Sequence, residues 1–297
     1  LTESLGRLWA LEELGAPPEG IVFLWHSIAP ARRPETVAVR EAWPFVGRVL
    51  DMLGIGGEVR LAQAPARIGR LVVPSQLMAL ASGPQVAGHP RFRAFARRLA
   101  AHPAVQGAAG AERVFVSRGR LNEAHARLLL EPWLDELFAA AGYTVIHPET
   151  LPLEAQLAHY VTARELVFSE GSAIHLFALV ARPEQRVGVI LRRHPPMRRF
   201  ATQLRHAGVE QVTEFDAVTA LGALERPWNM KYSDSALDFA ALVRGLGEAG
   251  FLPRGAVAPP GAAEVAAAFA ARQAELALAF PGRTFRLVPR EALRGVM

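Results

Sequence analysis

Residues 166–175 of the chain read LVFSEGSAIH, and this stretch decides the fold. Leu166–Phe168 is a short apolar run that is typical of a buried strand. A turn containing Glu170 and Gly171 follows, and Ser172–Val180 has the composition of a helix. A strand that passes through a small-residue turn into a helix is part of a βαβ unit, so the stretch predicts an α/β fold.

The same alternation of strand and helix continues on both sides of this stretch. Apolar runs predict strands at Arg113–Val116, Tyr143–Ile146, Leu166–Phe168, Val187–Leu191 and Val209–Phe215. The segments between them predict helices at Asn122–Ala141, Leu153–Ala163, Ser172–Val180 and Pro196–Ala207. This order favours a parallel sheet with right-handed crossovers and with helices on both faces.

The N-terminal part predicts a second, smaller α/β unit. Its expected elements are helices at Leu1–Leu14, Pro34–Leu53 and Pro90–Leu99 and strands at Ile21–Trp25, Glu58–Gln63 and Arg70–Val73. Pro103–Gly110 is interpreted as a linker, and an alanine-rich helix is expected at Ala262–Phe280. We therefore expect an N-terminal α/β domain (1–106) that lacks its start, a larger α/β domain (107–250) and an alanine-rich helical tail (251–297).

The composition excludes several classes of protein. Of 297 residues, 51% are hydrophobic and 21% charged, so a large core can form and wholesale disorder is excluded. The 33 basic residues, among which Lys231 is the sole lysine, exceed the 28 acidic residues by five. The absence of cysteine excludes disulfides, a thiolate nucleophile and cysteine-ligated zinc. Apolar runs end well short of the ~18 residues of a transmembrane helix, so none is expected.

Common phosphate and metal motifs are missing. The sole lysine follows Met230, which excludes a P-loop, and Gly54–Gly57 lies between a predicted helix and a strand, the wrong order for a dinucleotide fingerprint. The nine histidines are scattered, and the nearest approach to Asp-x-Asp is Glu214-Phe215-Asp216. No metal site is expected, so arginines and backbone amides would have to hold any diphosphate.

Candidate phosphate ligands follow three of the predicted strands, whose carboxyl ends meet at one edge of a parallel sheet. Gly171 and Ser172 begin a helix, and the free N–H groups of a helix start attract anions. Arg118 and Arg120 follow the first strand, and Arg192 follows the fourth. Each feature alone is equally a helix cap or a solvated charge, but their convergence on one edge favours a phosphate site.

Three motifs occur in order and at suitable spacing: SRGRLNE at 117–123, GYTVIHPETLPLEAQ at 142–156 and SEGSAIH at 169–175. Together they resemble glycosyltransferase family 61, a group linked to bacterial capsular polysaccharide biosynthesis. Its pattern is Ser-Arg, then Asn-Glu, then a Gly-aromatic strand with Glu and Gln after it, then a Gly-Ser loop with a following His. The resemblance covers about residues 1–191, and the tail departs from it.

The resemblance implies a GT-B-like α/β fold, in which two Rossmann-like domains face a cleft, and an inverting glycosyltransferase without a metal or other cofactor. It implies a nucleotide-sugar donor, held by the domain at 107–250, and a glycan or lipid-linked glycan acceptor. By resemblance, Arg118, Gly171, Ser172 and Ala173 bind the donor diphosphate. The other donor-site residues would be Arg120, Glu149, Glu170, His175 and Arg192.

An inverting transfer needs a base for the acceptor hydroxyl. By resemblance, Glu3 occupies the acidic position of the family's N-terminal helix and is the candidate base; a carboxylate that only complements a helix start is the alternative. Glu170 is the rival base, or it accepts a sugar or ribose hydroxyl, and Glu149 either meets the nucleoside or caps a helix. Asn122 and Glu123 match the family pair and are expected to start a helix and fix the preceding arginine loop.

Alternative functions stay open at this point. A sugar-nucleotide epimerase or hydrolase on the same fold would use carboxylates in the donor cleft and need no acceptor, and a non-catalytic polysaccharide-assembly module would only bind partners. Arginines alternate with aromatics in Arg91–Arg98, but an amphipathic surface helix explains that stretch, so no nucleic-acid partner is expected. The expected location is the cytoplasm, including the inner face of the membrane, and a homo-oligomer is left open.

Overall fold

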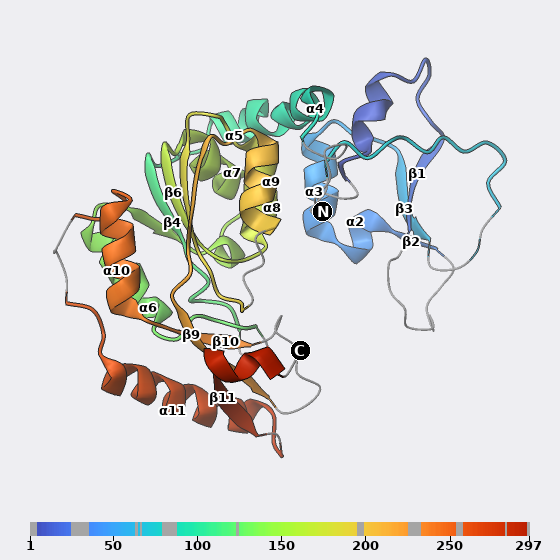
Figure 1. Ribbon diagram of the computed structural model, residues 1–297. Coiled ribbons are helices and arrows are strands. Elements are labelled where there is room, and N and C mark those ends of the chain that lie inside the picture. Colours follow the sequence, from blue (N-terminus) through green and yellow to red (C-terminus); the bar gives the residue numbers. More distant parts are fainter. Residues whose placement is uncertain are drawn as a thin grey trace.

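The computed structural model describes residues 5–24, 36–62, 65, 67–78, 88–122, 125–194, 199–224, 233–253, 258–282 and 284–295. Within these ranges the strands form one sheet of five strands and two sheets of three. Figure 1 shows the five-stranded sheet beside the smaller N-terminal sheet, with the third sheet at its lower end. Helices accompany the parallel strands, so the predicted α/β class is confirmed.

The five-stranded sheet is parallel throughout. Its strands are β4 (Arg113–Val116), β5 (Thr144–Ile146), β6 (Glu165–Ser169), β7 (Arg186–Ile190) and β8 (Gln211–Phe215). Their order is β5-β4-β6-β7-β8, so the chain moves outward from β4 to β5 and then crosses back to the other side of β4. The boundary between β4 and β6 is therefore the topological switch point, where sheets of this kind bind ligands outside their carboxyl ends.

Helices cover both faces of this sheet, as its apolar strands predict. They are α6 (Glu131–Ala140), α7 (Leu153–Thr162), α8 (Ala173–Val180), α9 (Arg199–Ala207) and α10 (Phe239–Glu248). Successive side chains of a strand point to opposite faces. Leu166 and Phe168 therefore join the core formed with α7, α8 and α9, whereas Val167 joins the core formed with α6 and α10.

One predicted helix is shorter than expected. The pattern predicts a helix from Asn122, but α6 begins at Glu131, and residues 121–122 and 125–130 lie in turns and extended segments. Pro132 explains the late start, because proline fits the first turn of a helix but not its interior. Leu130 precedes α6 with φ of 60°, a left-handed conformation that interrupts any helix from upstream.

The N-terminal sheet has the order β1-β3-β2, with β3 parallel to β1 and antiparallel to β2. Its strands are β1 (Gly20–Leu24), β2 (Thr36–Ala38) and β3 (Glu58–Ala62), with helices α2 (Val39–Ala42) and α3 (Pro44–Met52) between β2 and β3. The single helix predicted over Pro34–Leu53 is wrong, because residues 36–38 pair with β3 and Pro44 starts a new helix.

Two other N-terminal predictions are corrected. Arg70–Val73 forms no strand; these residues are exposed and pair with no neighbouring strand. The helix predicted over Leu1–Leu14 has only the short 3-10 helix η1 (Leu8–Glu12) and one preceding turn in its described part. Its apolar side is nevertheless buried, since Leu5 and Leu8 belong to the core.

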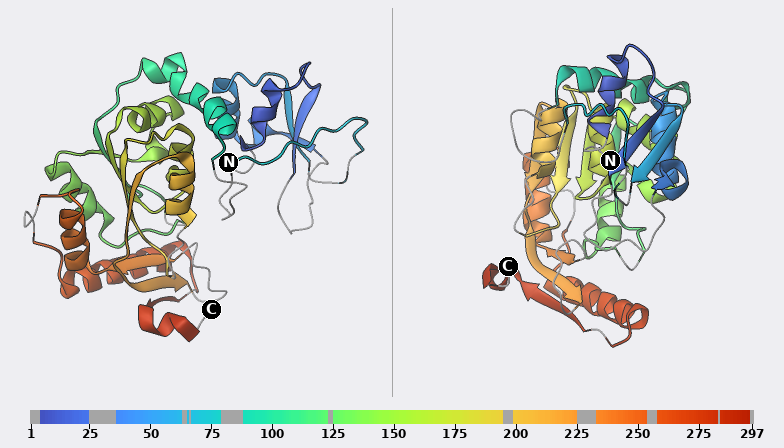
Figure 2. Two further views of the ribbon diagram at one scale, coloured as in Figure 1. Left: turned by 45° about the horizontal axis from the view of Figure 1, so that its top comes forward. Right: turned by 90° about the vertical axis from the view of Figure 1, so that its right-hand side faces the viewer.

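Helices α4 (Pro90–Ala101) and α5 (Pro103–Gln106) join the N-terminal sheet to the five-stranded sheet. In both views of Figure 2 they lie along the end of the larger sheet, and they pack on α8 and α7 respectively. The expected linker Pro103–Gly110 therefore contains a packed helix. Gly110 also lies so close to Thr162 of α7 that a Cβ there would clash with its side chain.

The third sheet is antiparallel and was not predicted. It has the order β10-β9-β11, formed by β9 (Val218–Leu224), β10 (Asp234–Leu237) and β11 (Phe285–Pro289). The expected alanine-rich helix is present as α11 (Ala262–Ala279) and packs on β11, which η5 (Arg290–Gly295) follows. The division at residues 106 and 250 stays a prediction. Within the described ranges we find no helix with the length and apolar character needed to span a bilayer.

Candidate functional site

The turns after β4 and β6 meet at the switch point. Val116 lies opposite Phe168 in the sheet, so the residues that follow the two strands emerge side by side. Gly171 packs directly on the side chain of Arg118: a Cβ built on Gly171 would clash with Nη1 of Arg118 and lie 3.1 Å from its Cδ. The absence of a side chain at Gly171 therefore makes room for the Arg118 guanidinium.

Arg118 is held at both its backbone and its guanidinium. Its backbone N–H donates to Oε1 of Glu131 at 2.7 Å, and its Nη2 donates to the carbonyl oxygen of Ala126 at 3.0 Å. Its Nε is buried without a hydrogen-bond partner among the described residues. Burial is the main cause that lowers the pKa of Arg118, and the charge of Arg193 lowers it further. An anion beside this guanidinium would offset both effects.

Glu131 holds the turn of Arg118 in place, and the sequence analysis missed this residue. Its carboxylate is 1% exposed and accepts the N–H of Arg118 at 2.7 Å and that of Leu128 at 3.4 Å. Burial raises the pKa of Glu131. The expectation that Asn122 helps to start a helix is wrong, because the helix starts at Glu131, which holds the arginine loop. Glu123 lies outside the described residues. The signal for Glu131 was the Glu-Pro pair at 131–132, typical of a first helical turn.

Glu170, Arg192 and Arg193 form a second buried group at the same edge. Oε2 of Glu170 accepts the backbone N–H groups of Arg192 at 2.7 Å and Arg193 at 3.2 Å. Its Oε1 lies 3.3 Å from Nη1 of Arg193. The Glu170 side chain is wholly buried, so its carboxylate holds the end of β7 and faces no solvent.

Arg192 turns inward rather than toward solvent. It is 1% exposed, and its Nη1 donates to the carbonyl oxygen of Ser233 at 2.8 Å, while its Nε is buried without a hydrogen-bond partner among the described residues. Burial first, and then the charges of Arg118 and Arg193, lower the pKa of Arg192 to about 10. The sequence analysis predicts Arg192 as a phosphate ligand at this edge, but the structure places its side chain in the interior.

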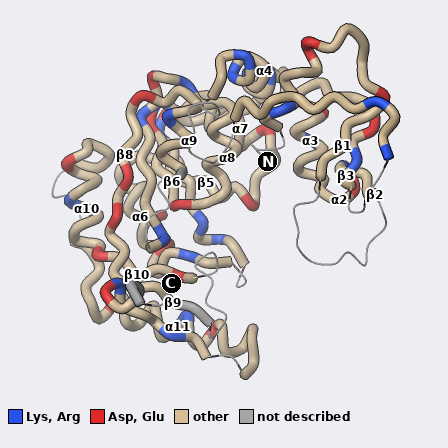
Figure 3. The backbone as a smooth tube through the Cα atoms, turned by 45° about the vertical axis from the view of Figure 1, so that its right-hand side comes forward, with Lys and Arg blue, Asp and Glu red and all other residues tan. Residues whose placement is uncertain are grey.

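Three arginines lie close enough at this edge to affect one another. The guanidiniums of Arg118, Arg192 and Arg193 interact with one another and with the carboxylates of Glu131, Glu149, Glu170 and Asp234. Figure 3 shows basic segments near α6 and the ends of the strands. Arg118, with a buried Nε that has no hydrogen-bond partner among the described residues, is the guanidinium of this group that suits an anionic ligand.

The start of α8 adds backbone donors. Ser172 is exposed and is the N-cap of α8 without a side-chain cap bond, and Ala173 is the first helical residue. The backbone amides at a helix start have no intrahelical acceptor and carry partial positive charge. The helix therefore presents donors beside Gly171, where Arg118 also lies.

His175 is engaged elsewhere, and Glu149 lies at the surface. Nδ1 of His175 lies 2.8 Å from Oε1 of Gln203, and its ring packs 5.3 Å from that of Phe200, both on α9. His175 is thus committed to the packing of α8 on α9. Glu149 is exposed on the short helix η3 (Pro148–Thr150), and its charge acts on Arg118.

A small titratable cluster lies beside the Arg118 turn. Oδ2 of Asp135 lies 3.5 Å from Nε2 of His147, and the backbone N–H of Gly119 donates to Oγ of Ser117 at 2.9 Å. Burial raises the pKa of Asp135, and the hydrogen bond from Ser117 and the charge of the exposed Arg120 oppose the rise.

The third sheet and α11 hold residues 125–127, which lie next to Arg118. Asp234 of β10 accepts the backbone N–H of Arg127 at 2.7 Å and pairs with Nε of Arg272, on α11, at 2.7 Å. Nη2 of Arg272 also donates to the carbonyl oxygen of His125 at 3.3 Å. Residues 125–127 include Ala126, the acceptor for Arg118, so α11 takes part in fixing the site.

The candidate base and the question of a metal site are the two remaining points of the sequence analysis. Glu3, the candidate base, lies outside the described residues. Among the residues that the structure describes, no three His, Asp or Glu side chains are grouped so that they could hold a metal ion.

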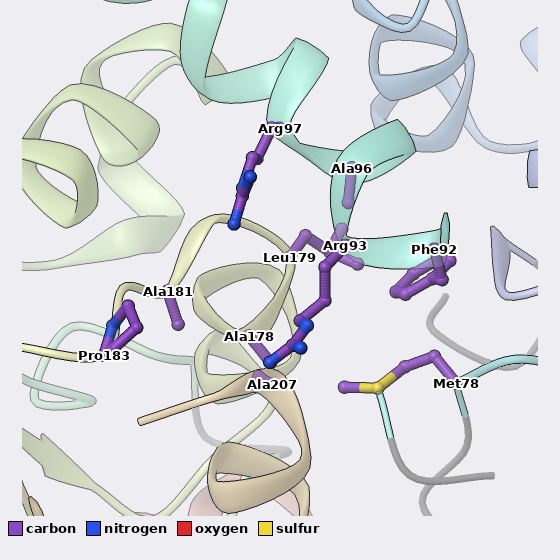
Figure 4. A pocket seen from close by; sticks show the side chains of 10 residues that line it. All are labelled: Met78, Phe92, Arg93, Ala96, Arg97, Ala178, Leu179, Ala181, Pro183 and Ala207. Atoms are coloured by element: carbon purple, nitrogen blue, oxygen red, sulfur yellow. The ribbon is translucent and has the colours of Figure 1, made fainter. Parts of the chain in front are cut away.

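A cavity of about 30 Å³ lies between α4, α8 and α9, at the opposite end of α8 from Gly171. Figure 4 shows Arg93 and Arg97 extending from α4 toward it, with the guanidinium of Arg93 beside Ala178 and Ala207. Nη1 of Arg93 lies near Gly208, at the carbonyl end of α9, where a cation is stabilised by the helix dipole. The cavity has room for about one water, so we read it as a packing feature.

Comparison with known proteins adds no assignment: no model of a protein family matches the chain, and no curated protein matches it. Function must therefore be argued from the geometry of the switch point and from the motif resemblance.

Proposed function

We propose that the chain is an inverting glycosyltransferase that needs no metal and moves a sugar from a nucleotide-sugar donor to a glycan or lipid-linked glycan acceptor in bacterial surface polysaccharide biosynthesis. The observation that carries the proposal is the contact of Arg118 with Gly171 at the switch point between β4 and β6. In the proposed GT-B-like arrangement, the five-stranded unit is the donor half and the N-terminal unit the acceptor half.

The donor diphosphate would lie between the Arg118 guanidinium and the amides of Gly171, Ser172 and Ala173. These donors are fixed before the ligand arrives, since Glu131 and Ala126 hold Arg118. Preorganised donors stabilise charge that develops on a leaving group, and this is usually the largest contribution to catalysis. Arg192 and Arg193 would add long-range positive charge without touching the ligand.

In the proposed reaction the acceptor oxygen attacks the anomeric carbon on the face opposite the diphosphate. The carbon–oxygen bond to the diphosphate breaks, its electron pair stays on the leaving nucleoside diphosphate, and the acceptor proton passes to a base. Glu3 stays the proposed base. Glu170 does not fit the role of base, because its carboxylate is wholly buried and accepts the backbone N–H groups of Arg192 and Arg193. Glu149 keeps its proposed contact with the nucleoside.

The test is binding of a panel of nucleotide sugars and nucleoside diphosphates, measured by thermal shift and then by calorimetry. We expect at least one nucleoside diphosphate to bind, and Arg118→Ala to weaken it about tenfold or more, because a charge-assisted contact is lost. Arg164→Ala is the matched control, since its side chain is 80% exposed at the amino end of β6. Full affinity in Arg118→Ala would overturn the proposed site.

Incubation of the best donor with and without glycan acceptors then tests the reaction. Glycosylated product that forms only with an acceptor supports a transferase. Turnover without any acceptor would instead indicate the epimerase or hydrolase, and binding without turnover a non-catalytic module. The proposed location is the cytoplasm, including the inner face of the membrane.

A further inference from the structure

The loop Arg67–Val73, with the sequence RIGRLVV, is an exposed apolar segment of the N-terminal unit. All seven residues are exposed, and the exposed fractions are 43% for Ile68, 61% for Leu71, 55% for Val72 and 71% for Val73. Contiguous exposed apolar side chains on a folded protein mark an interaction surface more often than isolated ones do.

The C-terminal end of the loop is anchored. Nε1 of Trp9 donates to the carbonyl oxygen of Ser75 at 3.0 Å, and the N–H of Leu77 donates to that of Gly6 at 2.9 Å. Figure 1 shows the segment at the outer edge of the N-terminal unit, away from the five-stranded sheet. The apolar side chains of the loop are therefore presented at a defined place on the surface.

The positive charge of the loop and of the N-terminal unit favours an anionic partner for this surface. Residues 1–106 contain twelve arginines and eight aspartates and glutamates, a charge of +4, which is most of the +5 of the whole chain. Arg67 and Arg70 lie in the loop itself, and both are exposed. Arginines beside exposed aliphatic side chains suit a surface that has anionic headgroups above an acyl layer. A symmetric contact with a second copy would instead bring these like charges together.

We propose that the Arg67–Val73 loop docks the protein on an anionic membrane surface. Leu71, Val72 and Val73 enter the boundary between headgroups and acyl chains, and Arg67 and Arg70 bind lipid phosphates. Docking involves residues of the N-terminal unit alone and needs no nucleotide sugar. Only one consequence rests on the proposed function, namely that docking brings the acceptor half next to a lipid-linked glycan.

The experiment is flotation of the whole chain with vesicles, without any nucleotide. We expect the protein to float with vesicles of equal parts phosphatidylcholine and phosphatidylglycerol, and less with phosphatidylcholine alone. Leu71→Ser/Val72→Ser should weaken binding about tenfold or more. Arg67→Ala/Arg70→Ala should weaken it about fivefold for each arginine removed, and added salt should do the same to the wild type.

Leu278→Ser is the matched control, because Leu278 is 84% exposed on α11 and stands outside the loop. It should bind vesicles like the wild type. All four proteins should unfold at similar temperatures, since the altered side chains are exposed. The proposal is overturned if the wild type does not float with anionic vesicles or if the loop variants bind equally well. Dimers in sedimentation that Leu71→Ser/Val72→Ser disrupts, without vesicle binding, would assign the loop to a second copy.

Discussion

Glu131 accepts the backbone N–H of Arg118 at 2.7 Å, and this bond joins the start of α6 to the turn after β4. The same carboxylate accepts the N–H of Leu128, so both ends of the intervening loop share one buried acceptor. The orientation of Arg118 thus depends on a side chain that does not itself face the proposed ligand. Stability and ligand binding are expected to be linked through this carboxylate.

Replacement of Glu131 by alanine is expected to lower the free energy of unfolding by about 3 kcal/mol, because two buried N–H groups lose their acceptor. Urea unfolding measures the change. Glu136→Ala is the control, since Glu136 is exposed on the same helix, and a surface substitution of this kind changes stability by about 0.5 kcal/mol or less. Equal losses in the two variants would contradict the role of Glu131.

The pH dependence of stability provides a second test of Glu131. Burial raises its pKa above the ordinary value of 4.5. An acid with a raised pKa in the folded state binds its proton more tightly there, so its stabilising contribution is complete below the unfolded pKa and is lost as pH rises through the folded pKa. The glutamine side chain of Glu131→Gln does not ionise, so the stability of this variant lacks the pH dependence that Glu131 contributes. The stability advantage of the wild type over Glu131→Gln should therefore be largest below pH 4.5, the ordinary pKa of the carboxyl, and shrink as pH rises through the higher pKa of the folded state.

Urea unfolding of both proteins at a series of pH values measures this difference. Glu136→Gln, altered at the exposed position on the same helix, is the matched surface control and is measured at the same pH values. A difference for Glu131→Gln that grows with rising pH would show that the carboxylate is stabilised mainly in its charged form.

The parallel strands were predictable because each residue of a doubly covered strand is buried, as in Leu166-Val167-Phe168, and leaves a continuous apolar run. β10 was not predictable in this way. Its residues 234–237 are just as buried, but they include Asp234 and Ser235, whose polar groups bond to other parts of the chain. The residues around Asp234 contain no pattern that predicts its burial, because its partner Arg272 is 38 residues away in the sequence.

The candidate site was predictable from the sequence only in part. Arg118 and Gly171 were proposed because the carboxyl ends of parallel strands share an edge, and this topology places them in contact. The rule says which edge a residue lies on, but not whether its side chain points out. Glu170 and Arg192 follow strands at that edge, yet both turn into the interior.

Gly171→Ala is expected to separate binding from stability. The new Cβ would clash with Nη1 of Arg118, which is the movable end of a long side chain, so the free energy of unfolding should fall by less than about 1 kcal/mol. Displacement of the guanidinium should nevertheless weaken nucleoside diphosphate binding about tenfold in calorimetry. In an Arg118→Ala background the same substitution should have little further effect, because the clash is gone. An additive loss in the double variant would argue that Gly171 acts independently of Arg118.

Arg272→Ala tests whether α11 belongs to the site. Arg272 is 6% exposed and pairs with the buried Asp234, whose pKa burial raises. Its removal leaves a buried carboxylate without its partner, so the free energy of unfolding should fall by about 3 kcal/mol, as urea unfolding measures. Because Asp234 also holds the N–H of Arg127, nucleoside diphosphate binding should weaken as well.

The double variant Arg272→Ala/Asp234→Ala distinguishes the buried pair from simple loss of packing. It should recover part of the stability, since no isolated charge stays buried, but not the binding, because Arg127 lacks its acceptor. Arg244→Ala, at an exposed position on α10, should change neither quantity. Wild-type affinity in a folded Arg272→Ala protein would show that the loop at 125–127 holds Arg118 without help from α11, and the helix would then be a stabilising element alone.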